Sequence, residues 1–144
     1  MGKRIIQQAR GHGSLTYRVR CSAYKFRIGY PIIEGKAKIL KLINSPAHSA
    51  PLAMIRINDK IFYNLAPEGI FEGQEITLGS EEGKGNILKL KDMQVGSNVY
   101  NIEARPGDGG KLVRSSGSSG IVTKKLAGVV AVMMPSKKEI FFDE

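Results

Sequence analysis

Residues 52–65 read LAMIRINDKIFYNL, two apolar runs on either side of a short polar turn. In the first run every second residue is Ala or Ile, whereas Arg56 faces the other way, which is the two-residue period of a half-buried strand. Residues 58–60 begin with Asn and Asp, whose short polar side chains favour tight turns. The stretch therefore predicts a β-hairpin with strands over 52–57 and 61–65.

The chain beyond residue 36 repeats this pattern of short apolar runs broken by turn residues, with no helical period longer than a turn or two. We expect one set of strands at 36–43, 52–57, 61–65, 74–78 and 86–90, and a second set at 99–103, 111–114, 120–126, 129–134 and 139–142. The prediction is an all-β protein with two small barrels, residues 36–90 and 91–144, divided at the polar segment 91–96. Two barrels of this size would be marginal alone, so we expect them to pack together.

The positive charge of the chain is concentrated at its start. The formal net charge is +9 and the sequence pI is about 9.8, which favours a polyanionic partner. Residues 1–30 hold no acid, and their cations are Lys3, Arg4, Arg10, Arg18, Arg20, Lys25 and Arg27; the aromatic residues Tyr17, Tyr24, Phe26 and Tyr30 lie among them. Aromatic rings can stack on unpaired bases, so we expect residues 1–35 to be a basic RNA-binding extension that orders on binding. The alternative is a solvated arm whose aromatic side chains pack on the neighbouring domain.

A second candidate site is the loop GDGGKLVRSSGSSG, residues 107–120. Glycine lets bare backbone N–H groups approach an anion, serine hydroxyls donate to phosphate oxygens, and Lys and Arg supply cations. The alternative is a flexible Gly/Ser linker. The pattern excludes a nucleotide-binding phosphate loop, because Arg105 stands where its first glycine is needed and Leu112 follows the lysine. The candidate RNA contacts of this loop are Gly107, Gly109, Gly110, Lys111, Arg114, Ser115, Ser116 and Gly117, with His12 of the extension as a further phosphate neighbour.

The remaining composition argues against catalysis and metal binding. Cys21 is the single cysteine, and His12 and His48 are not at ligand spacing with it, so we expect no disulfide, metal or cofactor. The sequence has no Gly-x-Ser-x-Gly turn. It also shows no secretory signal at its start and no apolar run of about eighteen residues. From these features we expect a cytoplasmic protein that is not an enzyme and has neither a membrane nor a small-molecule partner.

Read in order, several stretches give the chain a specific resemblance to the universal L-two family of large ribosomal subunit proteins. They are GKRIIQQARGHGSLTYR (2–18), HSAPLAMIRI (48–57), LAPEGIFEGQEI (65–76), EARPGDGGKLVRSSGSSG (103–120) and PSKKEIFF (135–142). The start resembles the archaeal and eukaryotic branch. The resemblance implies an oligonucleotide-binding (OB) barrel followed by an SH3-like barrel, with a basic N-terminal arm threading into rRNA and the 107–117 loop lying against it. Phe62 stands where the family often has a basic residue, so the resemblance implies a stacking or core role for this side chain.

The function implied is that of a structural constituent of the large subunit, with large-subunit rRNA and neighbouring ribosomal proteins as partners. The alternative is a soluble OB-type module that binds tRNA or other RNA without stable incorporation into the ribosome. Family members continue past Glu144 with a strand that closes the second barrel and a basic, glycine-rich tail. We therefore expect the strand at 138–143 to be an exposed edge, or to pair with another molecule. In the family this tail carries a histidine placed near the peptidyl transferase centre, and no residue here matches it, so we expect any part in peptide-bond formation or subunit joining to be weakened.

Overall fold

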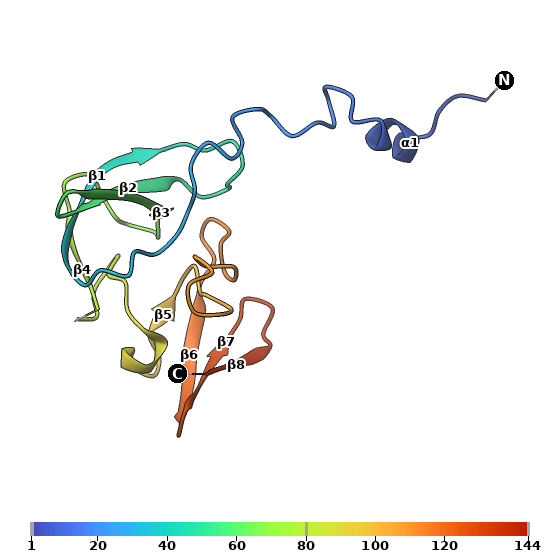
Figure 1. Cartoon of the computed structure of the whole chain (residues 1–144). Helices are drawn as coiled ribbons and strands as arrows, with labels where there is room; N and C mark the ends of the chain where they lie inside the picture. Colours follow the sequence, from blue (N-terminus) through green and yellow to red (C-terminus); the bar gives the residue numbers. More distant parts are fainter. Residues whose placement is uncertain (1, 80, 144) are drawn as a thin grey trace.

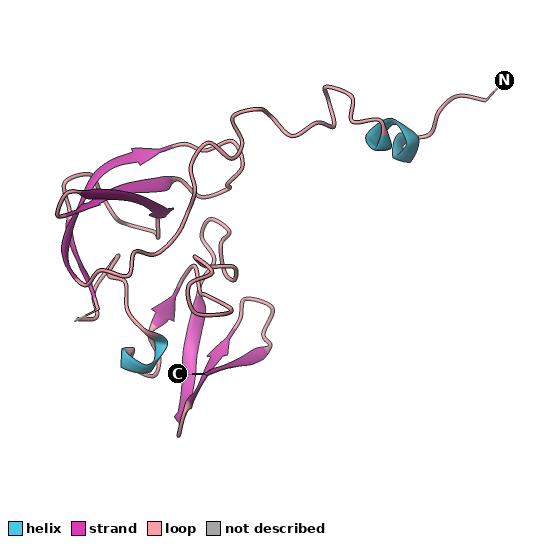
Figure 2. Ribbon diagram, viewed as in Figure 1, coloured by secondary structure: helices cyan, strands magenta, loops and turns pink. Residues whose placement is uncertain are grey.

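A computed structural model describes residues 2–79 and 81–143 of the chain. The elements are α1 (Ile6–Gly11), β1 (Gly35–Ile43), β2 (Leu52–Ile57), β3 (Lys60–Leu65), β4 (Glu75–Leu78), a short 3-10 helix η1 (Leu90–Asp92), β5 (Asn98–Val99), β6 (Gly120–Leu126), β7 (Val129–Met133) and β8 (Glu139–Asp143). The strands form two antiparallel sheets in the orders β3-β2-β1-β4 and β5-β6-β7-β8 (Figures 1 and 2). The prediction of an all-β protein with an extended basic N-terminal arm is confirmed.

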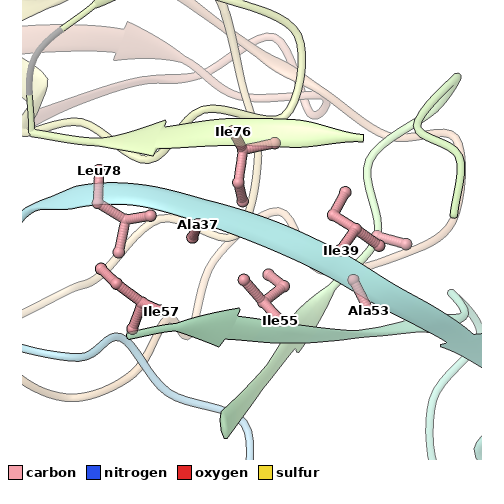
Figure 3. Close-up of a cluster of buried hydrophobic side chains, with 8 residues drawn as sticks. Ala37, Ile39, Ala53, Ile55, Ile57, Ile76 and Leu78 are labelled. Atoms are coloured by element: carbon pink, nitrogen blue, oxygen red, sulfur yellow. The ribbon is translucent and has the colours of Figure 1, made fainter. Parts of the chain in front are cut away.

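The first sheet is built around the predicted hairpin. Strand β2 has the predicted bounds, and β3 begins one residue early because Asn58 adopts φ +50 and closes a two-residue turn between Ile57 and Lys60. The inward side chains of β1, β2 and β4 interdigitate in Figure 3. Together with Ala66, which follows β3, they form the buried core around the first sheet: Ala37, Ile39, Ala53, Ile55, Ile57, Ile76 and Leu78. The alternation in the sequence therefore separates the core face from the outer face correctly.

The strand predicted at 86–90 is wrong. Ile87 forms an isolated parallel bridge with Leu78, and the chain enters η1 at Leu90. The side-chain amide of Asn86 competes with strand pairing, because its Oδ1 accepts from the Thr77 N–H at 3.0 Å and its Nδ2 donates to the Glu81 carbonyl at 2.9 Å. An apolar run alone does not reveal this local competition.

The strand predicted at 111–114 is also wrong. The N–H groups of Lys111 and Leu112 both donate to the Ile102 carbonyl, at 2.8 and 3.0 Å, and Val113 has φ +51. A positive φ at a β-branched residue cannot continue a ladder. The strand predicted at 99–103 is correspondingly short, since β5 pairs with β6 only through Asn98 and Val99.

The second sheet packs Val122, Val130, Val132 and Phe142 against residues of η1 and the following turn. Strand β8 pairs with β7 and stands at the edge of the sheet, as expected for 138–143. Its outward side chain Phe141 is 57 % exposed.

Two buried contacts join the halves of the molecule. A third apolar cluster places Ala50, Leu52 and Leu65 of the first half against Tyr100 of the second, with Phe26 and Ile28 of the arm packed on them. A polar network connects the same parts of the chain: Asn101 Nδ2 donates to Asn64 Oδ1 at 2.7 Å and to the Tyr30 hydroxyl at 3.0 Å, and that hydroxyl donates to the Asn101 carbonyl at 2.6 Å. The arm therefore takes part in the contact between the two sheets.

Candidate nucleic-acid interface

The cations of the arm are exposed. Lys3, Arg4, Arg10, Arg18, Arg20, Lys25 and Arg27 all have solvent-exposed side chains, as has His12. The first part of the arm, including α1, has no buried residue from 2 to 22 and extends away from both sheets (Figure 1). Arg10 lies over the ring of Tyr17 and Lys25 over the ring of Phe26, each 5.6 Å from the ring centroid. Exposed cations and aromatic rings therefore follow one another along the arm, where a polyanion can reach them.

The sequence left two roles open for the aromatic residues of the arm, stacking on RNA bases or packing on the neighbouring domain, and the structure divides these residues into two groups. Phe26 packs on Tyr63 with ring centroids 4.8 Å apart, and Tyr30 is part of the buried polar network. Burial raises the pKa of Tyr30 to about 12, an effect that the hydrogen bonds from the Asn64 and Asn101 side chains only partly oppose. Tyr17 and Tyr24 are exposed, Tyr24 at 77 %. The packing alternative thus holds for Phe26 and Tyr30, whereas Tyr24 is exposed and Tyr17 is exposed with Arg10 over its ring.

The last part of the arm is fixed by backbone contacts to the edge strand of the first sheet. Ile28 forms a parallel bridge with Tyr63, and the Gly29 N–H donates to the Tyr63 carbonyl at 3.2 Å. The arm therefore enters the molecule beside β3 at a defined register. This register places Lys25 and Arg27 next to the sheet.

The glycine turn at 107–110 binds carboxylates of its own chain. Glu103 accepts hydrogen bonds from the N–H groups of Gly107 and Gly109, at 3.0 and 2.8 Å. Asp108 accepts from the Gly110 N–H at 2.9 Å, and also from the N–H groups of Ala104 and Arg105. The N–H groups that were predicted to meet phosphates therefore already have anionic partners, and the glycine-rich turn organises the loop from within.

The pKa of Asp108 reflects this arrangement. Desolvation raises it, but the hydrogen bonds from the N–H groups of Gly110, Arg105 and Ala104, together with the nearby charge of Lys111, hold it below its ordinary value of 3.8. The carboxylate is thus charged at neutral pH and remains bound to the backbone. Its hydrogen bonds keep it within the glycine turn.

Two of the glycines are required by close packing. Gly109 has φ +80, and a Cβ there would lie 3.0 Å from the Ile28 carbonyl oxygen of the arm. Gly110 has φ +88, and a Cβ there would overlap the side-chain amide of Asn101. Gly107 has a similar φ but faces open space. The conformational freedom of glycine is used here to bring the loop, the arm and the polar network together.

The basic part of the loop lies on the outside. Lys111, Ser115, Ser116 and Gly117 are exposed and Arg114 is partly exposed. The Arg114 carbonyl accepts from the Tyr100 hydroxyl at 3.0 Å, and the Ser116 N–H donates to Ser49 Oγ at 3.3 Å. These bonds hold the loop against the 48–50 turn, so the loop is anchored and the linker alternative does not describe it.

His48 lies close to this basic loop. Desolvation, and then the charge of Arg114, lower the pKa of His48 from its ordinary value of 6.5. Its Nδ1 lies 2.9 Å from Oγ of Ser45, but Ser45 is buried and three residues away, which is the geometry of a turn. A cation beside the imidazole also disfavours the protonated form that a general base must reach. The pair is therefore a structural contact.

The structure brings the 111–117 loop, the 48–49 turn and residues 25–30 of the arm to one side of the molecule, whereas the arm cations at 3–20 lie apart from them (Figure 1). Sequence reasoning missed the residues that organise this side: Glu103, Asp108, Ser49, Tyr100 and Asn101. The acids flanking the glycines in EARPGDGG were the available signal. Across residues 2–79 and 81–143, no cluster of His, Cys, Asp and Glu could hold a metal, and no helix is long and apolar enough to cross a membrane.

Comparison with known proteins gives consistent matches along the chain. A family model described as Ribosomal Proteins L2, C-terminal domain, matches residues 83–144. The protein named large ribosomal subunit protein uL2 of Methanocorpusculum labreanum is 42 % identical over 153 aligned residues, covering 100 % of this chain and 64 % of the relative. Its namesakes from Archaeoglobus fulgidus and Methanococcus maripaludis are 40 % and 44 % identical, with 99 % and 94 % of this chain covered and 62 % and 61 % of the relatives. The chain thus spans less than two thirds of these relatives.

Proposed function

The chain belongs to the uL2 family of large ribosomal subunit proteins, of the archaeal type, and from this premise we propose that it is a structural constituent of the large subunit that binds and anchors large-subunit rRNA. The observation that carries the proposal is the concentration of exposed positive charge in the N-terminal arm. Every Lys and Arg of residues 2–30 is exposed and no acid lies among them. The proposed site of action is the cytoplasmic ribosome, with rRNA and neighbouring ribosomal proteins as partners.

The arm acts by neutralising phosphates that converge on it. A block of like charges with few contacts to the rest of the chain repels itself, and it orders when a polyanion surrounds it. Each phosphate that is neutralised also releases condensed counterions, which favours binding at low salt. The exposed rings of Tyr17 and Tyr24 are suited to stack on unpaired bases.

The loop acts through its side chains. Because Glu103 and Asp108 occupy the N–H groups of the glycine turn, RNA contact falls to Lys111, Arg114 and the exposed hydroxyls of Ser115 and Ser116. The planar guanidinium of Arg114 can bind a phosphate in a bidentate way. Gly107, Gly109 and Gly110 then contribute by shaping the loop, while Gly117 at φ +70 allows a close approach of its backbone.

The salt dependence of RNA binding tests this function. With about six to ten phosphates contacted, the affinity of the full chain for large-subunit rRNA falls by a factor of about 10³ to 10⁵ between about 50 and 200 mM salt. A flat salt dependence would refute the mechanism. Retention on large subunits through a high-salt wash separates an integral component from a soluble RNA-binding module, which would be removed by the wash.

A further inference from the structure

The outer face of the first sheet carries a second group of cations. Strand pairing puts Lys38 opposite Arg56, and Lys41 in one row with Met54 and Tyr63, all on the side away from the core. Lys36 lies two residues before Lys38 and shares its face. The side chains of Lys36, Lys38, Lys41 and Arg56 are all exposed. Two neighbouring strands thus present four cations on one face.

A bulge in β1 completes this group. The pairing register shifts between Ile39, which faces Ile55 in the core, and Lys41, which faces Met54 on the outside. Without the extra residue, Leu40, position 41 would have the parity of the core positions 37 and 39. The bulge redirects Lys41 to the outer face and returns Leu42 to the core.

The cations of this face are poorly compensated within the chain. Lys38 and Arg56 are directly opposite each other, an arrangement of like charges that costs stability in a sheet. Glu75 is the acid in the same row, yet the two ion pairs found among residues 2–79 and 81–143 are Lys89–Glu34 and Lys124–Glu139. An external anion would relieve this repulsion.

The face is continuous with the candidate interface. At one end of the face, Leu52 and Leu65 are covered by Phe26 and Ile28 of the arm together with Tyr100. Next to them Phe26 packs on Tyr63, with Lys25 over the Phe26 ring. A recess of about 250 Å³ beside β3 is lined by both Arg27 and Ile61, and Ile61 pairs with Arg56. The cations of the arm and of the sheet therefore border one surface.

We propose that the outer face of the first sheet, with Lys36, Lys38, Lys41 and Arg56, binds the phosphate backbone of double-helical RNA. This inference rests on the proposed function and adds to it a site separate from the arm and the 111–117 loop. Lys supplies point charges for phosphates, and the one aromatic ring in these rows of the described strands, Tyr63, is already packed against Phe26. The open part of the face, which carries Ile61, therefore offers an unpaired base no ring on which to stack. Paired RNA, which is recognised by shape and backbone, suits it better.

A charge-matched pair of variants tests the proposal in the full chain. One combines Lys36→Gln, Lys38→Gln and Arg56→Gln, and its control combines Lys84→Gln, Lys137→Gln and Lys138→Gln, three exposed lysines elsewhere on the molecule. The probe is a fluorescent RNA duplex of about 20 base pairs. The face variant should lose about two to three units of salt slope and bind at least about tenfold more weakly at about 100 mM salt, while the control binds like the unmodified chain. Equal losses in both variants, or none in the face variant, would overturn the site.

Lysine acetylation of the unmodified chain gives a second test, which does not depend on any substitution. Bound duplex should protect Lys36, Lys38 and Lys41 from acetylation, as measured by mass spectrometry, and leave Lys84, Lys137 and Lys138 reactive. Unchanged reactivity at the first three would overturn the inference.

The failure of this site can be distinguished from the failure of the proposed function. If Arg114→Gln weakens binding while the face variant does not, this site fails and the proposed function stands. If the unmodified chain does not bind RNA at about 50 mM salt, the proposed function itself fails.

Discussion

Gly110→Ala should destabilise the protein far more than Gly107→Ala, although both glycines lie in the same turn. Both have positive φ, +88 and +83, so an alanine at either position introduces a strain of about 1–2 kcal/mol. A Cβ at Gly107 meets open space, whereas one at Gly110 overlaps the Asn101 amide. Asn101 is 2 % exposed, and its displacement breaks the hydrogen bonds to Asn64 and Tyr30.

The size of the difference follows from these bonds. Two lost hydrogen bonds at about 1 kcal/mol each, with their buried partners left unsatisfied, bring the expected cost of Gly110→Ala to about 3–5 kcal/mol. This is a large part of the roughly 5–15 kcal/mol that stabilises an ordinary domain. Urea unfolding of the full chain, followed by far-ultraviolet circular dichroism, measures both free energies of unfolding.

A double-mutant cycle isolates the cause. In an Asn101→Ala background the overlap is absent, so Gly110→Ala should cost only the backbone strain of about 1–2 kcal/mol. Equal costs for Gly107→Ala and Gly110→Ala in the otherwise unmodified chain would refute the reasoning, as would an undiminished cost of Gly110→Ala in the Asn101→Ala background. Either outcome would mean that Gly110 is not held by the network between the two halves.

Three further outcomes follow from the interface. Arg114→Gln and Lys111→Gln should each lower the slope of log affinity against log salt by about one unit in RNA titrations and leave the unfolding curve unchanged; an unfolded variant would show that the side chain is structural. The pKa of His48 is lowered in the free chain, and a phosphate near Arg114 would raise it. RNA binding should therefore take up a proton and strengthen as the pH falls below neutrality, an effect that His48→Gln should abolish. Tyr30 has its pKa raised from 10.0 to about 12, so its contribution to stability is complete below pH 10 and is lost as the pH rises to about 12; Tyr30→Phe should be less stable at neutral pH and show less of this alkaline loss.

Much of the fold could be predicted because most of its apolar runs form strands with one buried and one exposed face, which gives the sequence an alternating pattern. The alternation around Arg56 and the Asn-Asp turn predicted β2 and β3 almost to the residue. The runs at 86–90 and 111–114 look equally strand-like, but the Asn86 amide and the positive φ of Val113 end the pairing there. These are local hydrogen bonds and dihedral angles, and the hydrophobic period carries no information about them.

The charged residues of the candidate site could be predicted from the sequence, but the hydrogen-bond partners within the site could not. The exposed arm cations and the basic loop could be predicted from the composition, because charged side chains stay in contact with water wherever the fold places them. The use of Glu103 and Asp108 as anions for the glycine turn depends on a loop geometry that spacing alone does not reveal. The row of Lys36, Lys38 and Arg56 depends on strand register, and the outward direction of Lys41 depends on a bulge.

Crosslinking of the protein to rRNA in intact large subunits tests the central claim most directly. Ultraviolet crosslinks mapped by mass spectrometry should fall both on the exposed aromatic side chains of the arm, Tyr17 and Tyr24, and on the loop at 111–117. Subunits that contain the protein but yield no rRNA crosslink in either segment would contradict the account, because the basic arm and the basic loop would then face away from the RNA they are proposed to hold.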